Sequence, residues 1–202
     1  DGTPVSSSSG GPVVHRRSDG GAAVSEEATD RFEFVNLLGR GFFGEVWEVK
    51  DKSTGMVYAL KKVRKIHLLM HNATSSLMSE IRIMYQLKHP NIVQLIFHFE
   101  DKQAIYLGVE HAEKGTLHDK LRTAVRFENP EAAQYEAGTL QAIAYLHALD
   151  PMIVHRDIKP ENVLLDGEDK VKLCDFGGSK ALHMGGRTAS IVGTVDYLAP
   201  EV

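Results

Sequence analysis

One polar segment of this chain restricts its fold and chemistry more than any other part. The segment runs His155-Arg156-Asp157-Ile158-Lys159-Pro160-Glu161-Asn162, and the apolar residues Val163-Leu164-Leu165 follow it directly. It therefore carries an acid, a lysine two positions later and an asparagine five positions later. Beyond the strand-like apolar run, a second acid opens the triplet Asp175-Phe176-Gly177. This order predicts that two carboxylates, an amide and an ammonium group meet at one site.

These residue types suit the transfer of a phosphoryl group. Asp157 can orient a hydroxyl group and accept its proton, and Lys159 can neutralise a phosphoryl oxygen. Asn162 and Asp175 offer hard oxygen ligands to Mg²⁺. The alternative is a solvated polar loop between two strands, and the order of the motifs described next argues against it.

A glycine-rich turn lies near the start of the folded part. Gly39, Gly41 and Gly44 form a Gly-x-Gly-x-x-Gly pattern between the strand-like runs 32–38 and 45–49. By itself the pattern also fits a dinucleotide-binding turn or a simple hairpin. A dinucleotide-binding turn should open a helix, whereas the residues after Gly44 alternate as a strand does. The pattern therefore predicts a turn between two strands whose backbone amides approach phosphates.

A lysine and an acid downstream of this turn form a predicted ion pair. Lys61 ends a Tyr-Ala-Leu-Lys sequence in the predicted strand 56–63. Glu80 lies in a predicted helix over about residues 75–87, whose apolar stripe is formed by Leu77, Ile81 and Met84. Pairing with Glu80 would orient Lys61 and report whether the helix is docked. Lys62 and Glu45 remain the alternative partners.

In this order the motifs resemble the protein kinase superfamily from Arg31 to Glu201. Lys159 and Thr194 are similar to those of serine/threonine kinases. Within these, the sequence resembles the Aurora group in Arg31-Phe32-Glu33-Phe34, Gly115-Thr116-Leu117 and Gly193-Thr194-Val195-Asp196-Tyr197-Leu198. It departs from that group at Gly178, where those kinases place tryptophan, at Ala199, where they place proline, and in the sequence Arg187-Thr188-Ala189-Ser190.

The resemblance implies an α+β fold of two lobes. A β-rich N-lobe of five strands and one helix is expected over residues 31–109, and the hinge with a mainly helical, incomplete C-lobe over residues 110–202. ATP and Mg²⁺ are the implied ligands. The resemblance assigns catalytic roles to Asp157, Lys159, Lys61 and Glu80, and metal binding to Asn162 and Asp175. It implies that ATP contacts Gly39, Gly41, Gly44, Val46, Ala59, Lys61, Val109, Glu110, Ala112 and Leu164. It also implies a regulatory column of Met84, Leu95, His155 and Phe176.

The segment from Gly178 to Ala199 corresponds by the same resemblance to the activation segment. Ser190 lies where similar kinases carry their activating phosphate, and it follows Arg187 at a spacing that basic-directed kinases recognise. We predict phosphorylation of Ser190, with Thr188 as the second candidate and Arg156 as the partner of the phosphate. An unmodified serine in a loop remains the alternative. Cys174, directly before Asp175, is either a reactive thiol or an inert small residue.

Composition limits the partners and the compartment. The chain has 202 residues with a formal net charge of −4, so no basic field predicts binding to nucleic acid or to a membrane. A single cysteine fits a reducing compartment, and no run approaches the roughly 20 apolar residues of a spanning helix. Residues 1–30, rich in Ser and Gly, predict a disordered tail. The expected location is intracellular, in cytoplasm or nucleus, and at the spindle or centrosome for an Aurora-like kinase.

The expected partners are ATP, protein substrates with Ser or Thr acceptors and upstream basic residues, and an activating protein. The alternative function is that of a pseudokinase or truncated nucleotide-binding scaffold, without catalysis. The sequence starts without Met and stops at Val202, directly after Ala199-Pro200-Glu201. Kinases continue with further C-lobe helices, so we expect a fragment or an incomplete gene product.

Overall fold

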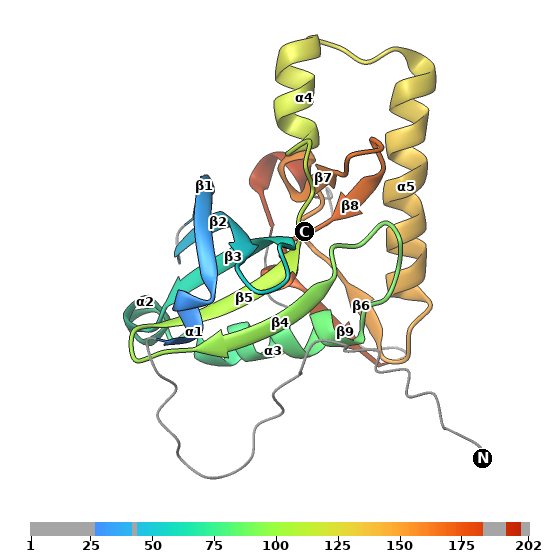
Figure 1. The fold of residues 1–202 in the computed structure, drawn as a ribbon. Helices are drawn as coiled ribbons and strands as arrows, with labels where there is room; N and C mark the ends of the chain where they lie inside the picture. Colours follow the sequence, from blue (N-terminus) through green and yellow to red (C-terminus); the bar gives the residue numbers. More distant parts are fainter. Residues whose placement is uncertain (1–26, 42–43, 184–192, 199–202) are drawn as a thin grey trace, which may run out of the picture.

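The computed structural model of the protein describes residues 27–41, 44–183 and 193–198. These residues form a β-rich lobe and a mainly helical lobe, which lie side by side in Figure 1. The predicted two-lobed α+β fold is thus confirmed, with a C-lobe that is only partly present. The predicted phosphorylation sites Ser190 and Thr188 lie outside the described residues, as do residues 1–26 of the predicted tail.

A single antiparallel sheet builds the N-lobe. Its strands are arranged in the order β1-β2-β3-β5-β4, so that β3 lies at the centre. The five strands that the resemblance implied are all present, and the strand-like runs 32–38, 45–49 and 56–63 correspond to β1, β2 and β3. The strands are β1 (Phe32–Arg40), β2 (Gly44–Asp51), β3 (Val57–Arg64), β4 (Leu95–Glu100) and β5 (Ala104–Glu110).

The glycine-rich turn connects β1 and β2, as the sequence predicted. Backbone bonds between Gly41 and Gly44 close it, at 2.8 Å and 3.3 Å. A Cβ atom at Gly44 would lie 1.7 Å from the carbonyl oxygen of Lys62, so only glycine allows β2 to pair with β3 there. Gly44 is therefore required by the sheet itself, a reason that the motif did not reveal.

The last four residues of the predicted tail differ from the prediction. The predicted tail included residues 27–30, but Glu27–Asp30 form the short helix α1. Lys52 donates a hydrogen bond to the carbonyl oxygen of Asp30, at 2.8 Å. Arg31 pairs with the fully buried Asp51, which also accepts bonds from the amide and hydroxyl of Ser53. These contacts from β2 hold the chain in place before β1 begins.

We expect Asp51 to make folding stability depend on acid pH. Burial raises the pKa of this carboxyl, but hydrogen bonds from Arg31 and Ser53 lower it more, so it lies well below its ordinary value. Since the folded pKa is below the unfolded one, the stabilisation is complete above about pH 4 and is lost as the pH falls further. Urea unfolding near neutral pH should find Asp51→Asn less stable by about 2 kcal/mol.

At about pH 3 this difference should narrow, because the unfolded wild-type chain then binds the proton that the folded chain resists. The exposed Glu33→Gln on β1 is the control, and it should stay within about 0.5 kcal/mol of wild type at neutral pH. A difference between Asp51→Asn and wild type that is constant from neutral to acid pH would contradict the prediction.

Besides the short α1, the described part of the N-lobe contains two helices rather than the single helix predicted. The additional helix, α2 (Lys65–Met70), follows β3 directly, and Lys65 fixes its start by bonding the carbonyl oxygen of Asp101 at 2.6 Å. Six residues are too few for a helical period to be read from the sequence. The predicted helix is α3 (Thr74–Gln86), which buries Leu77, Glu80, Ile81, Ile83 and Met84.

The longest element of the described C-lobe is the helix α5 (Asn129–His147), and two small antiparallel sheets lie beside it (Figure 1). Its capping residue is Glu128, and Pro130 lies in the first turn. Gly138 lets α5 approach β8 closely, since a Cβ atom at Gly138 would lie 2.9 Å from the Cβ atom of Val171. The helix α4 (Leu117–Ala124) was not predicted; its N-cap is Thr116, which accepts a bond from the amide of Asp119.

Short elements complete the described C-lobe. They comprise two two-stranded sheets, in which β6 pairs with β9 and β7 with β8, and three single turns of 3₁₀ helix. The elements are β6 (Met152–Val154), η1 (Pro160–Asn162), β7 (Val163–Leu165), β8 (Val171–Leu173), η2 (Phe176–Gly178), β9 (Lys180–Leu182) and η3 (Val195–Tyr197).

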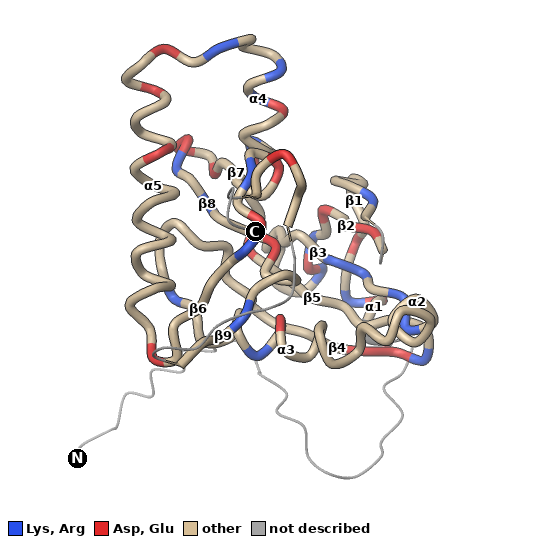
Figure 2. Tube along the Cα trace, turned by 180° about the vertical axis from the view of Figure 1, so that it is seen from behind, with Lys and Arg blue, Asp and Glu red and all other residues tan. Residues whose placement is uncertain are grey.

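One hydrophobic core spans both lobes. It joins the buried face of α3 to α5 and to the β7–β8 hairpin, with Phe176 only 1% exposed at its centre. A smaller aromatic cluster around Phe32, Tyr58 and Tyr106 lies within the sheet. Acidic and basic residues are scattered over both lobes in Figure 2. Among the described residues, no helix has the length and apolar character needed to cross a membrane.

Candidate active site

Three residues from distant parts of the chain meet where the lobes join. Lys61 on β3 donates a hydrogen bond to Oε1 of Glu80 on α3, at 2.7 Å. The same ammonium group lies 3.8 Å from Oδ1 of Asp175, which follows β8. The predicted partner of Lys61 is therefore the one observed. The sheet positions Lys61, while the buried face of α3 positions Glu80, which is 6% exposed.

The two carboxylates keep Lys61 charged. Burial alone would lower the pKa of this ammonium group, but the negative charges of Glu80 and Asp175 outweigh it, so the pKa is raised. A charged ammonium group at the junction of the lobes can bind phosphate oxygens. The side chain of Asp175 is half exposed and free to take further partners.

Three side chains surround Asp157, two from its own catalytic segment, residues 155–162, and one from Thr194. The amide of Asn162 donates to both the carbonyl oxygen and Oδ2 of Asp157, each at 2.8 Å. Lys159 lies 3.0 Å from the same Oδ2 atom. Thr194 donates its hydroxyl to Oδ1, at 2.7 Å, and Lys159 in turn donates to the Thr194 oxygen at 2.7 Å. The sequence brought Asp157, Lys159 and Asn162 together correctly.

These donors keep Asp157 ionised. Burial raises the pKa of its carboxyl, but the hydrogen bonds from Thr194, Lys159 and Asn162 lower it more, so the pKa falls below its ordinary value. A carboxylate this acidic is a weak base in its resting state. Asp157 is therefore suited to orient a hydroxyl group, and it can accept the proton of that group once the hydroxyl has become acidic.

Thr194 is a residue of the site to which the sequence assigned no role. It was noted only as a residue typical of serine/threonine kinases, because it lies far from Asp157 in sequence. The signal that could have identified it is Gly193, whose backbone has φ +130°. A Cβ at that position would lie 2.7 Å from the carbonyl oxygen of Arg156, so only glycine lets Thr194 reach the catalytic segment.

The predicted column of four residues is buried as expected. Met84, Leu95, His155 and Phe176 are all at most 5% exposed. The rings of His155 and Phe176 contact each other edge to face, with centroids 4.9 Å apart. His155 also bonds the carbonyl oxygen of Cys174, at 2.9 Å, which fixes the chain directly before Asp175. The column thus connects α3 to the metal-binding candidate.

Two residues of the site have left-handed backbones. Arg156 has φ +71° and Asp175 has φ +61°. Such conformations in residues other than glycine gather at functional sites, where the surrounding contacts maintain them. The Nε atom of Arg156 donates to the carbonyl oxygen of Gly178, at 2.6 Å, so this side chain ties the catalytic segment to the start of the activation segment.

Of the predicted nucleotide-binding residues, Val46, Ala59 and Val109 lie on the sheet and Leu164 on the β7–β8 hairpin. Val46 pairs with Lys61, and Ala59 pairs with Val109, in the register of the sheet. Glu110 ends β5, Ala112 follows in the hinge, and Leu164 lies in the middle of β7. Around Gly39 and Gly41 a Cβ would meet nothing within 4 Å, unlike around Gly44. This open space at the turn is what a phosphate-binding backbone requires.

The residues present also fit a magnesium ion. Because the nitrogen of the Asn162 amide donates to Asp157, its oxygen remains an acceptor, and the Asp175 carboxylate is accessible. Carboxylate and amide oxygens are the ligands that Mg²⁺ prefers. The neighbouring Cys174 is no competitor, since burial and the charge of Asp175 raise the pKa of its thiol to about 12. This favours the inert alternative for Cys174.

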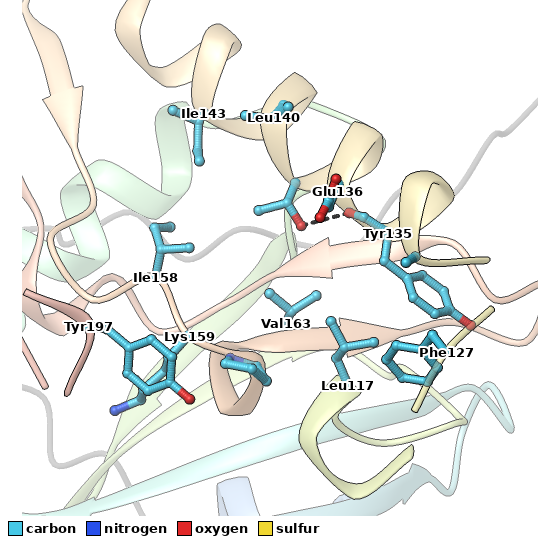
Figure 3. Close-up of a pocket in the computed structure, with 13 residues that line it drawn as sticks. Leu117, Phe127, Tyr135, Glu136, Leu140, Ile143, Ile158, Lys159, Val163 and Tyr197 are labelled. Carbon is cyan, nitrogen blue, oxygen red and sulfur yellow. Dashed lines mark hydrogen bonds between the residues drawn. The ribbon is translucent and has the colours of Figure 1, made fainter. Parts of the chain in front are cut away.

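A separate hollow of about 510 Å³ lies beside the catalytic segment, away from Lys61. Figure 3 shows apolar side chains from α4, α5 and the catalytic segment around it, including Leu117, Ile143 and Ile158, together with Tyr197. Leu140, on α5, also lines this hollow and is 63% exposed. An apolar hollow with one lysine, Lys159, at its edge is not suited to bind a nucleotide.

Comparison with known proteins agrees with this geometry. The family model described as the protein kinase domain matches residues 32–202. The Aurora kinase of Yarrowia lipolytica is 42% identical over 174 residues, covering 86% of this chain and 46% of that protein. The Aurora kinase of Schizosaccharomyces pombe is 39% identical over 191 residues, covering 95% and 53%. Serine/threonine-protein kinase Aurora-2 of Arabidopsis thaliana is 36% identical over 181 residues, covering 90% and 63%.

The fold, the paired Lys61 and Glu80 and the segment around Asp157 define a kinase domain, and the chain belongs to the protein kinase family. The three relatives named above are Aurora kinases, and the chain is similar to them over most of its length. The chain spans about half the length of the first two of these relatives.

Proposed function

We propose that this chain carries the catalytic centre of a protein serine/threonine kinase, which transfers the γ-phosphoryl group of ATP to a hydroxyl group of a protein. The observation that supports it best is the arrangement around Asp157, in which Lys159, Asn162 and Thr194 all bond one carboxylate. The Lys61–Glu80 pair adds a fixed positive charge from the opposite lobe.

In this proposal each residue acts mainly by position and charge. Lys61 and the backbone of the glycine-rich turn hold the phosphates, and Glu80 orients Lys61. Asp157 orients the acceptor hydroxyl so that its oxygen attacks the γ-phosphorus, while the bond to the β-phosphate oxygen breaks. The hydroxyl proton passes to Asp157, and Lys159 offsets the charge on the transferring group. The products are ADP and a phosphorylated protein.

Asn162 and Asp175 would hold Mg²⁺, which neutralises charge on the β- and γ-phosphates when bound. The adenine would lie between Val46 and Ala59 on one side and Leu164 on the other, with Val109, Glu110 and Ala112 at the hinge. These assignments rest on the family motif and on the placement of each residue described above.

The proposed substrates have Ser or Thr acceptors, with basic residues upstream, and an activating protein partner is expected. Phosphorylation at Ser190, or second at Thr188, with Arg156 as partner of the phosphate, remains our proposal for activation. We also propose an intracellular location, with the spindle or centrosome following only from the Aurora resemblance. Because the lysine, the two acids and the asparagine are all present and paired or accessible, no observation favours the pseudokinase alternative.

Intact-protein mass spectrometry after incubation with MgATP tests the proposed activity. We expect the purified chain to gain mass in phosphate units, or to transfer phosphate to a basic test protein, and we expect excess EDTA to abolish this. Circular dichroism must show that the chain is folded. No transfer from a folded chain that binds ATP would leave this chain with nucleotide binding alone and would contradict the proposal for it.

We expect Thr194→Val to slow transfer by about 10-fold to 100-fold, the equivalent of one or two hydrogen bonds to charged groups. The hydroxyl of Thr194 connects Asp157 to Lys159, so its loss leaves both side chains less well oriented. Thr194→Ser, which retains the hydroxyl, is the matched control and should keep most of the activity. Initial rates of phosphate transfer at saturating MgATP would check this; equal rates for the two variants would refute it.

A further inference from the structure

A side-chain ion pair connects the hinge to the β7–β8 hairpin. Glu110 is the last residue of β5, and its Oε1 atom lies 2.9 Å from Nζ of Lys172 on β8. The two side chains are 28% and 17% exposed, respectively, so solvent screens the pair only in part. Among the described residues Lys172 is the one charged partner of this buried oxygen, which accepts no hydrogen bond, so the contact is an ion pair without hydrogen-bond geometry.

The position of Lys172 connects this pair to nucleotide binding. Lys172 pairs directly with Leu164 across the β7–β8 hairpin, so the two side chains lie on one face of it. Leu164 is the residue proposed to support the adenine, and Glu110 belongs to the hinge that its edge contacts. The ion pair therefore sets the separation between the hinge and the support beneath the adenine.

The connection between α3 and β4 is hydrogen-bonded to β8 of the C-lobe, next to Lys172. Asn91, in the connection between α3 and β4, donates its side-chain amide to the carbonyl oxygen of Val171, at 3.0 Å. The amide of Leu173 donates to the carbonyl oxygen of Asn91, at 2.8 Å, and that of Val93 to Leu173, at 2.9 Å. This connection is thus fixed to β8 on both sides of Lys172. The amide of Glu110 also donates to the carbonyl oxygen of Gln94, at 3.0 Å, so the ion pair adds a side-chain contact to backbone bonds that already hold the end of β5 near β8.

The pair is formed in the assembled arrangement of the site. Lys61 contacts Glu80 and Phe176 is buried in the same structure in which Glu110 contacts Lys172. A rotation of β5 away from β8 would lengthen the contact between Glu110 and Lys172 and weaken it. An interaction made in only one of two conformations stabilises that conformation. A hollow of about 350 Å³ borders both residues and can admit water once they separate, so the contact is reversible.

We propose that Glu110 and Lys172 are positioning residues whose ion pair holds the hinge against the β7–β8 hairpin and stabilises the closed, nucleotide-binding arrangement of the two lobes. This inference rests on the nucleotide binding proposed above. It assigns a role to the side chain of Glu110, whereas the family motif concerns only the backbone at that position.

Charge removal and charge exchange test the proposal. Lys172→Met and Glu110→Gln should each weaken binding of a fluorescent ATP analogue by about fivefold, the range of a partly buried ion pair. In the absence of nucleotide, both should also speed hydrogen exchange at the amides of residues 104–112. The double variant Glu110→Lys with Lys172→Glu restores opposite charges, and it should recover most of the binding and the protection.

Lys170→Met is the matched control, since Lys170 pairs with the exposed Glu168 in the same hairpin and should change neither measurement. Thermal unfolding shows whether each variant is folded. The proposal is overturned if the single variants behave like Lys170→Met, if they bind the analogue more tightly, or if the charge exchange restores nothing. Should the wild type bind no ATP analogue, the proposed function fails, and the hydrogen-exchange measurement still decides the role of the pair.

Discussion

Replacement of Asp157 by asparagine is expected to lower phosphate transfer by about 1,000-fold while leaving ATP binding within about twofold of wild type. The amide cannot accept a proton and carries no negative charge to orient the acceptor hydroxyl. It also loses the charge that Lys159 contacts at 3.0 Å. ATP binding should persist because the phosphates are held from the other lobe, by Lys61 and the glycine-rich turn.

Intact-mass kinetics with MgATP measure the transfer, and a fluorescent ATP analogue measures binding. Glu168→Gln, an exposed acid in the turn between β7 and β8, is the control and should transfer phosphate at the wild-type rate. Asp157→Asn that remains folded and transfers phosphate within tenfold of wild type would remove Asp157 from the catalytic role. A parallel loss of ATP binding would show that the residue supports the cleft rather than the transfer.

Replacement of Lys61 by methionine is expected to damage both binding and stability. Nucleotide affinity should fall by at least about tenfold, because no other charged group on β3 is directed at the cleft together with Glu80 and Asp175. The unfolding free energy should fall by about 2 kcal/mol, less than for a fully buried pair since Lys61 is one-third exposed. The cause is Glu80, left buried without its partner.

The double variant Lys61→Met with Glu80→Gln separates these two effects. It should recover most of the lost stability, since the unpaired buried charge is gone, but none of the lost nucleotide affinity. Urea unfolding and analogue binding measure the two quantities. Lys62→Met, the neighbour on the same strand and an alternative that the sequence left open, is the control and should bind the analogue normally. Normal binding by Lys61→Met would contradict the assignment of the phosphate-holding lysine.

Local patterns were sufficient to predict the strands and the long helices. The runs over β1, β2 and β3 are rich in branched and aromatic residues, and the apolar stripe on α3 reflects the burial of one face, which leaves a period in the sequence. The prediction failed where no period could form. The helix α2 has only six residues, and its start depends on Lys65 reaching the β4–β5 turn, a contact between residues far apart in sequence.

The same distinction applies to the site. Asp157, Lys159 and Asn162 lie within six residues of one another, so their spacing was visible as a motif. The pairing of Lys61 with Glu80 could be predicted because each belongs to an element with a readable buried or paired face. Thr194 could not be placed, because its contact with Asp157 depends on the path of the chain past Gly193 and Arg156.

The sequence by itself determined the family, the two-lobed fold and the chemical groups of the site, because local periodicity and closely spaced motifs carry that information. Tertiary structure alone decided the contacts that no motif predicted. The charge state of Lys61, the hydroxyl of Thr194 between Asp157 and Lys159, and the contact of Glu110 with Lys172 all arise where separate elements pack together. Such contacts depend on distances across the fold, and spacing along the chain does not encode them.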